Sequence, residues 1–192
     1  MFLNYTPTPE PASGAFSSPA AILQRTNSVV LNIRPADLAD LEEITGVYNE
    51  AVRTTTATFD IEPKSSDEQL RWFESHDPRH PILVAELDGD VVGWACLAKW
   101  SDRAAYSETA ETSFYVEQQH RGKGIGRRLK QAIIDEARRL GFHSLIARAA
   151  QGSDESIHLN ESFGFEHVGT LKEVGRKFGN LLDVHIMQKL LD

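Results

Sequence analysis

A stretch of basic and glycine residues near the middle of the chain has the composition of an anion-binding loop. The sequence RGKGIG occupies residues 121–126, between a strand-like run and a helix-like pattern. Alternating glycines let the backbone approach a ligand closely, and the N–H groups of a helix's first turn point at whatever binds there. The loop favours a phosphate or pyrophosphate ligand, although a glycine-rich turn before a solvated basic helix would have the same composition.

Two common phosphate-binding loops do not fit this spacing. A P-loop requires Ser or Thr after its Gly-Lys pair, but Gly124 follows Lys123. The dinucleotide-binding fingerprint GxGxxG requires its third glycine one residue later than Gly126. The loop therefore indicates a phosphate-containing ligand of another kind.

The elements that position this loop follow from hydrophobic patterning. β-Branched and aromatic residues predict a strand over 111–116, and apolar residues at three- and four-residue steps predict a helix over 125–140, which Gly141 ends. Asp37 is the predicted N-cap of an earlier helix. Ser66, with Gln69 three residues later, forms the predicted capping box of another helix. A short helix is predicted over 155–163. Further strands are predicted over 29–34, 82–87, 91–98, 145–149, 165–171 and 182–187.

The order of these elements is β-α-α-β-β-β-α-β-α-β-β, which predicts an α/β protein with an α+β mixed sheet and helices on both faces. Asp88-Gly89 supplies a hairpin turn between the strands over 82–87 and 91–98. The 192 residues fit one domain, expected over 29–192. Residues 1–28 are rich in Pro, Ser, Thr and Ala, and we expect a flexible tail there, with a docked arm as the alternative.

Composition excludes several classes of protein. Lys and Arg number 20 against 28 Asp and Glu, and the resulting net charge of -8 disfavours general binding to nucleic acid or anionic membranes. No apolar run approaches the roughly 20 residues that span a bilayer. The one cysteine, Cys96, cannot form an internal disulfide and reads as a buried small hydrophobe. A cytoplasmic protein is expected.

Metal ligation is not expected. His76 and His80 are four residues apart, but Pro78 and Pro81 break the helical face that would bring them together. The remaining histidines fall on unrelated predicted elements and lack ligand spacing.

Several separated motifs resemble the GCN5-related N-acetyltransferase (GNAT) superfamily. Arg-x-x-Gly-x-Gly between a strand and an amphipathic helix is similar to its acetyl-CoA motif. Four further segments resemble the phosphinothricin and methionine sulfoximine N-acetyltransferase subgroup: 49–59 (NEAVRTTTATF), 109–116 (TAETSFYV), 156–165 and 173–179 (EVGRKFG). The resemblance runs from about Val30 to the C-terminus. It implies the GNAT acyl-CoA N-acyltransferase fold, a central mixed β-sheet flanked by helices.

The resemblance implies acetyl-CoA as co-substrate and assigns its contacts. The main chain of the strand before the loop would hold the pantetheine arm, and the loop amides would take the pyrophosphate. Ser153 and Asn160 stand where the family often has Asn and His or Tyr, respectively, and neither donates a proton readily at neutral pH. The source of the proton for the CoA thiolate is therefore open, and water is one option. The implied cofactor-binding residues are Phe114, Tyr115, Val116, Arg121, Gly122, Lys123, Gly124, Ile125, Gly126, Arg127, Ser153 and Asn160.

The resemblance also implies a general base, Glu111, on the strand before the loop. An amine is mostly protonated near neutral pH and must lose a proton before it attacks a thioester, so a nearby carboxylate suits that role. Members of the subgroup can carry arginine where Ser107 stands, which leaves Arg103 as the clamp for a substrate carboxylate or, alternatively, as a surface loop residue. The implied substrate residues are Phe59, Arg103, Tyr106 and Glu111.

The predicted function is acetyl transfer from acetyl-CoA to the α-amine of a small amino-acid-like substrate, of the phosphinothricin, methionine sulfoximine or methionine sulfone type. Acetylation of a protein N-terminus or a polyamine, and a non-catalytic CoA-binding module, remain as alternatives. Subgroup members are commonly homodimers, and the C-terminal strands through Lys177–Met187 are the expected interface. No metal is expected.

Overall fold

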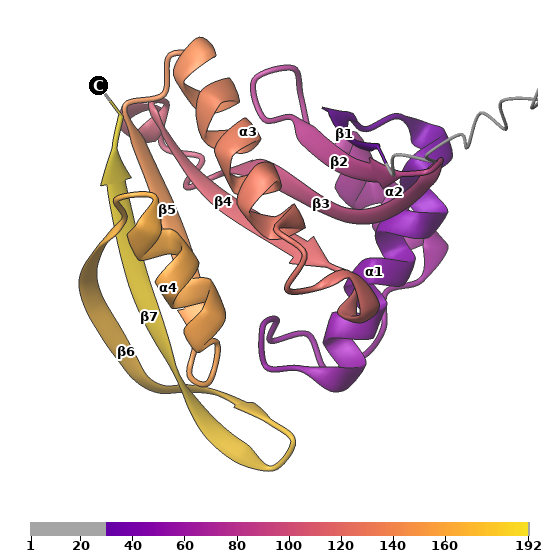
Figure 1. Cartoon of the computed structure of the whole chain (residues 1–192). Coiled ribbons are helices and arrows are strands. Elements are labelled where there is room, and N and C mark those ends of the chain that lie inside the picture. Colours follow the sequence, from indigo (N-terminus) through magenta and orange to yellow (C-terminus); the bar gives the residue numbers. More distant parts are fainter. Residues whose placement is uncertain (1–29, 192) are drawn as a thin grey trace, which may run out of the picture.

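A mixed sheet flanked by helices forms the body of the computed structural model, which describes residues 30–191 (Figure 1). Within those residues the sheet has seven strands in the order β1-β2-β3-β4-β5-β7-β6. The predicted order of elements and the mixed α/β class are confirmed. The elements are β1 (Leu31–Pro35), α1 (Leu41–Thr54), α2 (Ser66–Glu74), β2 (Ile82–Leu87), β3 (Asp90–Lys99), β4 (Thr109–Val116), α3 (Ile125–Arg139), β5 (Ser144–Ala150), α4 (Asp154–Ser162), β6 (Glu166–Lys177) and β7 (Asn180–Leu190), with 3₁₀ turns η1 (Leu38–Asp40), η2 (Ala104–Tyr106) and η3 (Gln118–His120).

The one parallel pairing in this sheet, between β4 and β5, is short. It joins only Thr109–Glu111 to Ser144–Ile146, whereas the other neighbouring strands pair antiparallel over longer stretches. Beyond Glu111 the two strands diverge, and Figure 1 shows the gap widening toward the end of β4. A V-shaped opening therefore lies at the centre of the sheet.

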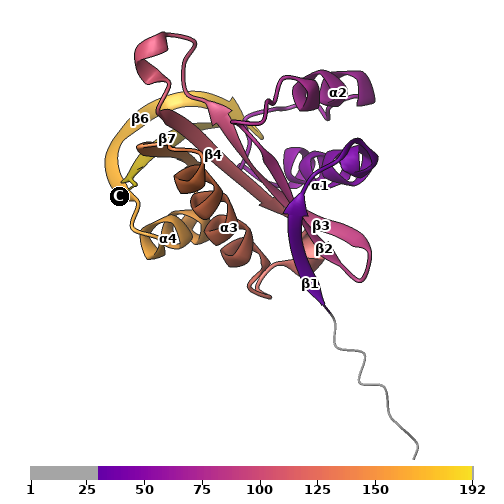
Figure 2. The same ribbon diagram turned by 90° about the horizontal axis from the view of Figure 1, so that it is seen from above.

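The two faces of the sheet carry separate apolar clusters because side chains alternate along each strand. α3 and α4 cover one face, while α1 and α2 cover the other (Figure 2). On β3, Ala95 and Leu97 join the cluster beneath α3, and Trp94 and Cys96 join the cluster beneath α1. The alternation continues on β4, where Ala110, Phe114 and Val116 belong to the α3 face and Tyr115 belongs to the α1 face.

Two local predictions needed correction. The capping box of α2 is formed by Ser65 and Glu68, one residue before the predicted Ser66 and Gln69. The Ser65 hydroxyl accepts from the Glu68 amide, and the Glu68 carboxylate accepts from the Ser65 amide. The side chain of Gln69 is instead buried.

The last two strands are longer than predicted, with a turn at Phe178-Gly179 in which both residues have positive φ. Most of β6 is solvent-exposed, so its polar positions gave no apolar pattern. By contrast, Asp37 caps η1 directly before α1, and Gly141, with φ +76°, follows the end of α3 as predicted.

The predicted tail, residues 1–28, lies outside the described residues. Among the helices of residues 30–191, none combines the length and apolar character needed to cross a membrane. Over the same range, no group of three or more His, Cys, Asp or Glu side chains is arranged to hold a metal ion.

Candidate active site

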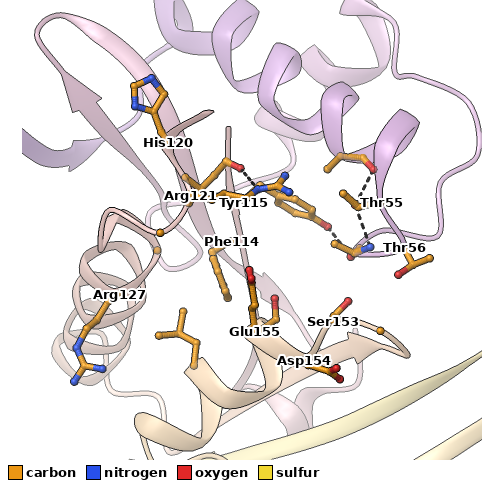
Figure 3. A pocket seen from close by; sticks show the side chains of 18 of the residues that line it. Thr55, Thr56, Phe114, Tyr115, His120, Arg121, Arg127, Ser153, Asp154 and Glu155 are labelled. Carbon is orange, nitrogen blue, oxygen red and sulfur yellow. Dashed lines mark hydrogen bonds between the residues drawn. The ribbon is translucent and has the colours of Figure 1, made fainter. Parts of the chain in front are cut away.

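A cavity of about 590 Å³ opens where β4 and β5 diverge (Figure 3). The end of β4, the loop after it, the first turn of α3, the N-terminal half of α4 and the segment after α1 all contribute to its walls. Such a volume suits a sizeable ligand. The lining residues are Ala51, Thr55, Thr56, Ala57, Phe114, Tyr115, Val116, His120, Arg121, Gly122, Gly124, Gly126, Arg127, Gly152, Ser153, Asp154, Glu155, Ser156 and Leu159.

The glycine-rich loop has the geometry of an anion-binding helix N-terminus. Gly122 and Gly124 adopt φ of +73° and +80°, a region that residues with a side chain rarely occupy. Gly124 precedes α3 and offers no side chain to cap it, so the first-turn N–H groups are free to meet a ligand. The Arg121 Nε donates to the Val116 carbonyl at 2.9 Å, which ties the loop to the end of β4. This arrangement fits a pyrophosphate.

Nine of the twelve predicted cofactor-binding residues line this cavity: Phe114, Tyr115, Val116, Arg121, Gly122, Gly124, Gly126, Arg127 and Ser153. The structure does not bring the other three side chains to it. Ile125 is buried in the cluster beneath α3, because it occupies the inward face of the first helical turn. Lys123 is exposed at the loop, and Asn160 is buried in α4.

A second, smaller cavity of about 50 Å³ adjoins the first. The smaller cavity continues between β4 and β5, and the two cavities share Ala57, Phe114, Tyr115, Ser153 and Ser156. Its lining adds seven side chains, of which the sequence analysis singled out only Asn160. The additional lining residues are Thr112, Ser113, Lys130, Ala147, Arg148, Ala149 and Asn160.

Glu111 stands where β4 and β5 part. It is the last β4 residue paired with β5, opposite Ile146. Its carboxylate accepts two hydrogen bonds from Arg148, from Nε and from Nη2, both at 2.7 Å. Sequence reasoning missed Arg148, although one signal existed: it is a lone charged residue within the apolar strand 144–150.

None of the four predicted substrate residues, which are Phe59, Arg103, Tyr106 and Glu111, lines either cavity. Phe59 is held against β6, where a Cβ on Gly175 would come within 2.2 Å of its ring. Arg103 and Tyr106 lie on the loop between β3 and β4, and Tyr106 is 42% exposed. The structure therefore places these three side chains on two segments, the one after α1 and the loop between β3 and β4.

The segment that carries Phe59 is anchored on both sides. The Tyr48 hydroxyl donates to the Asp60 carboxylate at 2.6 Å, and the buried Lys177 amine donates to the Thr58 carbonyl at 2.8 Å. These contacts join the segment to α1 and to the end of β6. These two contacts fix the residues on either side of Phe59, Thr58 and Asp60.

Cys96 is buried, and burial raises the pKa of its thiol to about 12. A thiol with so high a pKa stays protonated at neutral pH and is a poor nucleophile. The prediction that Cys96 is a buried small hydrophobe is confirmed.

Comparison with known proteins places this arrangement among acetyltransferases. The model of the acetyltransferase (GNAT) family matches residues 44–165. An L-methionine sulfoximine/L-methionine sulfone acetyltransferase of Salmonella typhimurium is 40% identical over 84% of this chain and 95% of its own. A phosphinothricin acetyltransferase of Sinorhizobium meliloti, solved in complex with acetyl-CoA, is 36% identical with a TM-score of 0.80, over 84% of this chain and 88% of that one. A ribosomal-protein-alanine N-acetyltransferase of Brucella melitensis is 41% identical with a TM-score of 0.80, over 83% and 99% of the two chains.

Proposed function

Because this chain belongs to the acetyltransferase (GNAT) family, whose members transfer the acetyl group of acetyl-CoA, we propose that it acetylates the α-amine of a small amino-acid-like substrate. Phosphinothricin, methionine sulfoximine and methionine sulfone are the substrate types, since relatives with those names cover most of the chain. The observation that carries the proposal is the position of Glu111, at the point where the β4–β5 opening meets the end of strand pairing.

Acetyl-CoA fits the larger cavity by its chemistry. The pyrophosphate would meet the free N–H groups at the start of α3, and the pantetheine arm would run along Phe114, Tyr115 and Val116 of β4. Beyond Glu111 the edge of β4 that faces β5 no longer pairs with that strand. Its main-chain groups are therefore available to hydrogen-bond an extended ligand and to polarise a thioester carbonyl.

Glu111 acts as the base that takes a proton from the attacking amine, directly or through one water. Arg148 holds the carboxylate by two hydrogen bonds, so the orientation of the base is fixed before substrate arrives. Arg103 binds the acid group of the substrate, and Phe59 and Tyr106 border the substrate. Arg103 and Tyr106 lie on the loop between β3 and β4, and Phe59 lies on the segment after α1.

A protein N-terminus is the second candidate substrate. It is favoured by the 41% identity to the ribosomal-protein-alanine N-acetyltransferase. A free amino acid and a peptide differ at the carboxyl end, where the peptide has an amide in place of the charged acid. Discrimination therefore depends on whether a cation such as Arg103 meets a carboxylate.

The proposal is tested by product analysis. Incubation with acetyl-CoA and methionine sulfoximine should give the N-acetyl product in amounts equal to the CoA released, as measured by mass spectrometry and thiol titration. The Glu111→Gln variant serves as the matched control. CoA release without an acetylated amine, or the same yield from the variant, would contradict the assignment.

We also propose that two copies associate through the β6–β7 hairpin. Its strands expose apolar side chains that a partner could cover: Val168, Leu171, Val174, Phe178, Leu181 and Leu190. Light scattering should give the mass of a dimer, and a monomer at micromolar concentration would exclude this interface.

A cytoplasmic location is proposed from the buried unpaired Cys96, which suits a reducing compartment.

A further inference from the structure

Lys130 of α3 is the largest side chain in the fully buried set, with 0% of its surface exposed. Within residues 30–191 its amine has no hydrogen-bond partner. Its closest aromatic contact is Phe165, whose ring centre lies 4.0 Å from Nζ, and Phe114 of β4 lies on another side at 5.8 Å. A buried amine without a hydrogen-bonded partner is costly, so its presence calls for an explanation.

Two further buried polar atoms near Lys130 also lack partners in the described part of the chain. They are the Thr112 hydroxyl of β4 and the Asn160 side-chain oxygen of α4. All three residues line the 50 Å³ cavity between β4 and β5. Three unpartnered polar groups around one small space indicate a ligand group that both donates and accepts hydrogen bonds.

Side chains from both faces of the sheet line this cavity, Phe114 from the α3 face and Tyr115 from the α1 face. Lys130 and Thr112 approach it from the α3 face, whereas Arg148, the partner of Glu111, lines it as well. The base and the Lys130 amine are therefore on opposite sides of the β4–β5 opening. In acyl transfer, one group can take the proton from the attacking amine while another gives a proton to the leaving thiolate.

We propose that Lys130 is the general acid that protonates the CoA thiolate. The inference rests on the proposed acetyl transfer. The amine nitrogen attacks the acetyl carbonyl carbon, the carbon–sulfur bond breaks, and its electron pair stays on sulfur. One proton passes from the amine to Glu111, and another passes from the Lys130 ammonium to sulfur, giving the amide and the free thiol. Solvent then returns a proton to Lys130 and removes one from Glu111.

The electrostatic surroundings of Lys130 suit this role. Burial lowers the pKa of its amine to about 7, so the proton is held loosely near neutral pH. A thiol has a pKa of about 8.5, so transfer from Lys130 to a thiolate is downhill. The other ionisable side chains that line this cavity are Tyr115 of β4 and Arg148 of β5, while α4 contributes Asn160, Ser153 and Ser156. No carboxylate lines the cavity to hold the Lys130 ammonium in place.

Lys130 also explains how the site could work with asparagine at position 160. The resemblance places a proton-donating His or Tyr at that position, and asparagine cannot supply a proton. Because Lys130 and Asn160 line the same cavity, the amine can supply the proton while the amide orients the sulfur.

The test compares wild type with Lys130→Met, which keeps an unbranched side chain one atom shorter and removes the amine. Lys172→Met, on an exposed lysine of β6, is the matched control. We expect kcat of Lys130→Met to fall about 10²-fold near neutral pH, with acetyl-CoA KM nearly unchanged. The alkaline decline in kcat, which reflects loss of the Lys130 proton, should disappear. Adding Asn160→His to Lys130→Met should restore part of kcat.

A readout independent of turnover is the NMR signal of the Lys130 side-chain nitrogen. In the CoA-free protein this amine should titrate near pH 7, and binding of CoA should change that titration more than binding of the desulfo analogue, which lacks the sulfur. An unchanged pH profile of kcat in Lys130→Met, together with a nitrogen titration that CoA and its desulfo analogue leave alike, would overturn the role of Lys130. Should the variant fail to fold, the nitrogen titration in wild type decides alone, and the same response to both ligands would overturn the role. A wild type that binds CoA yet acetylates no amine would instead refute the proposed function.

Discussion

At the scale of single residues, the Glu111–Arg148 pair has the most direct bearing on the chemistry. A carboxylate that accepts two hydrogen bonds from one guanidinium has a fixed orientation, and Arg is the side chain best suited to such a fork. Glu111 could be found from the resemblance, because its position before the loop matches the motif. Arg148 is on a strand 37 residues away and could be recognised as its partner only from the fold.

Replacing Glu111 with Gln should lower kcat by about 10² or more while acetyl-CoA affinity stays nearly the same, because the amide keeps the size of the side chain but accepts no proton. The loss should shrink at high pH, where more of the amine substrate is already neutral. Steady-state rates measure kcat, and isothermal titration measures the affinity for acetyl-CoA. Turnover equal to that of wild type at neutral pH would remove Glu111 from the mechanism.

Arg103 has a separate signature. If its guanidinium binds the substrate carboxylate, Arg103→Ala should raise the amino-acid KM by about 10- to 100-fold, since a hydrogen bond to a charged group contributes about 1.5–3 kcal/mol. For the same substrate with its carboxylate amidated, Arg103→Ala should change the KM little, because the charge that Arg103 recognises is absent. Equal losses for acid and amide would mean that Arg103 only shapes the loop between β3 and β4.

At the scale of elements, the short pairing between β4 and β5 creates the site. Period-two and helical patterns predicted the order of strands and helices, because burial on one face leaves a clear signal in the sequence. They could not predict where the pairing stops, since Thr109–Val116 reads as one continuous strand. Helical patterning also could not predict that Lys130 is buried, because a lysine in an amphipathic helix is normally expected on the solvated face.

The contact between Gly175 and Phe59 links β6 to the segment after α1. A Cβ at Gly175 would come within 2.2 Å of the Phe59 ring, so Gly175→Ala should displace the ring and raise the substrate KM several-fold. Gly169→Ala on the same strand is the control, because a Cβ there meets nothing within 4 Å. Identical substrate KM values for the two variants would show that Phe59 has no role in substrate binding.

At the scale of the whole molecule, the buried lysine couples folding to pH. Its pKa is about 7 in the folded protein, against about 10.4 in an unfolded chain. Between these values the unfolded chain holds a proton that the folded protein lacks, so this group makes stability rise with pH from about 7 to about 10. Urea unfolding of the CoA-free protein should show that rise in wild type and not in Lys130→Met. Parallel curves would mean that Lys130 is solvated.

The whole molecule also combines a cavity beside the glycine-rich loop with a carboxylate, Glu111, that Arg148 holds where β4 and β5 part, within a chain of net charge -8. These features support the proposed acetyl transfer to the α-amine of a small amino-acid-like substrate. The most direct test measures kcat/KM from free CoA thiol release, with acetyl-CoA and a panel of acceptors. Methionine sulfoximine, methionine sulfone and phosphinothricin should exceed polyamines and alanine-terminated peptides by at least about tenfold, the change that 1.4 kcal/mol of binding to a charged acid group provides. Higher values for peptides or polyamines, or no release with any amine, would contradict the claim.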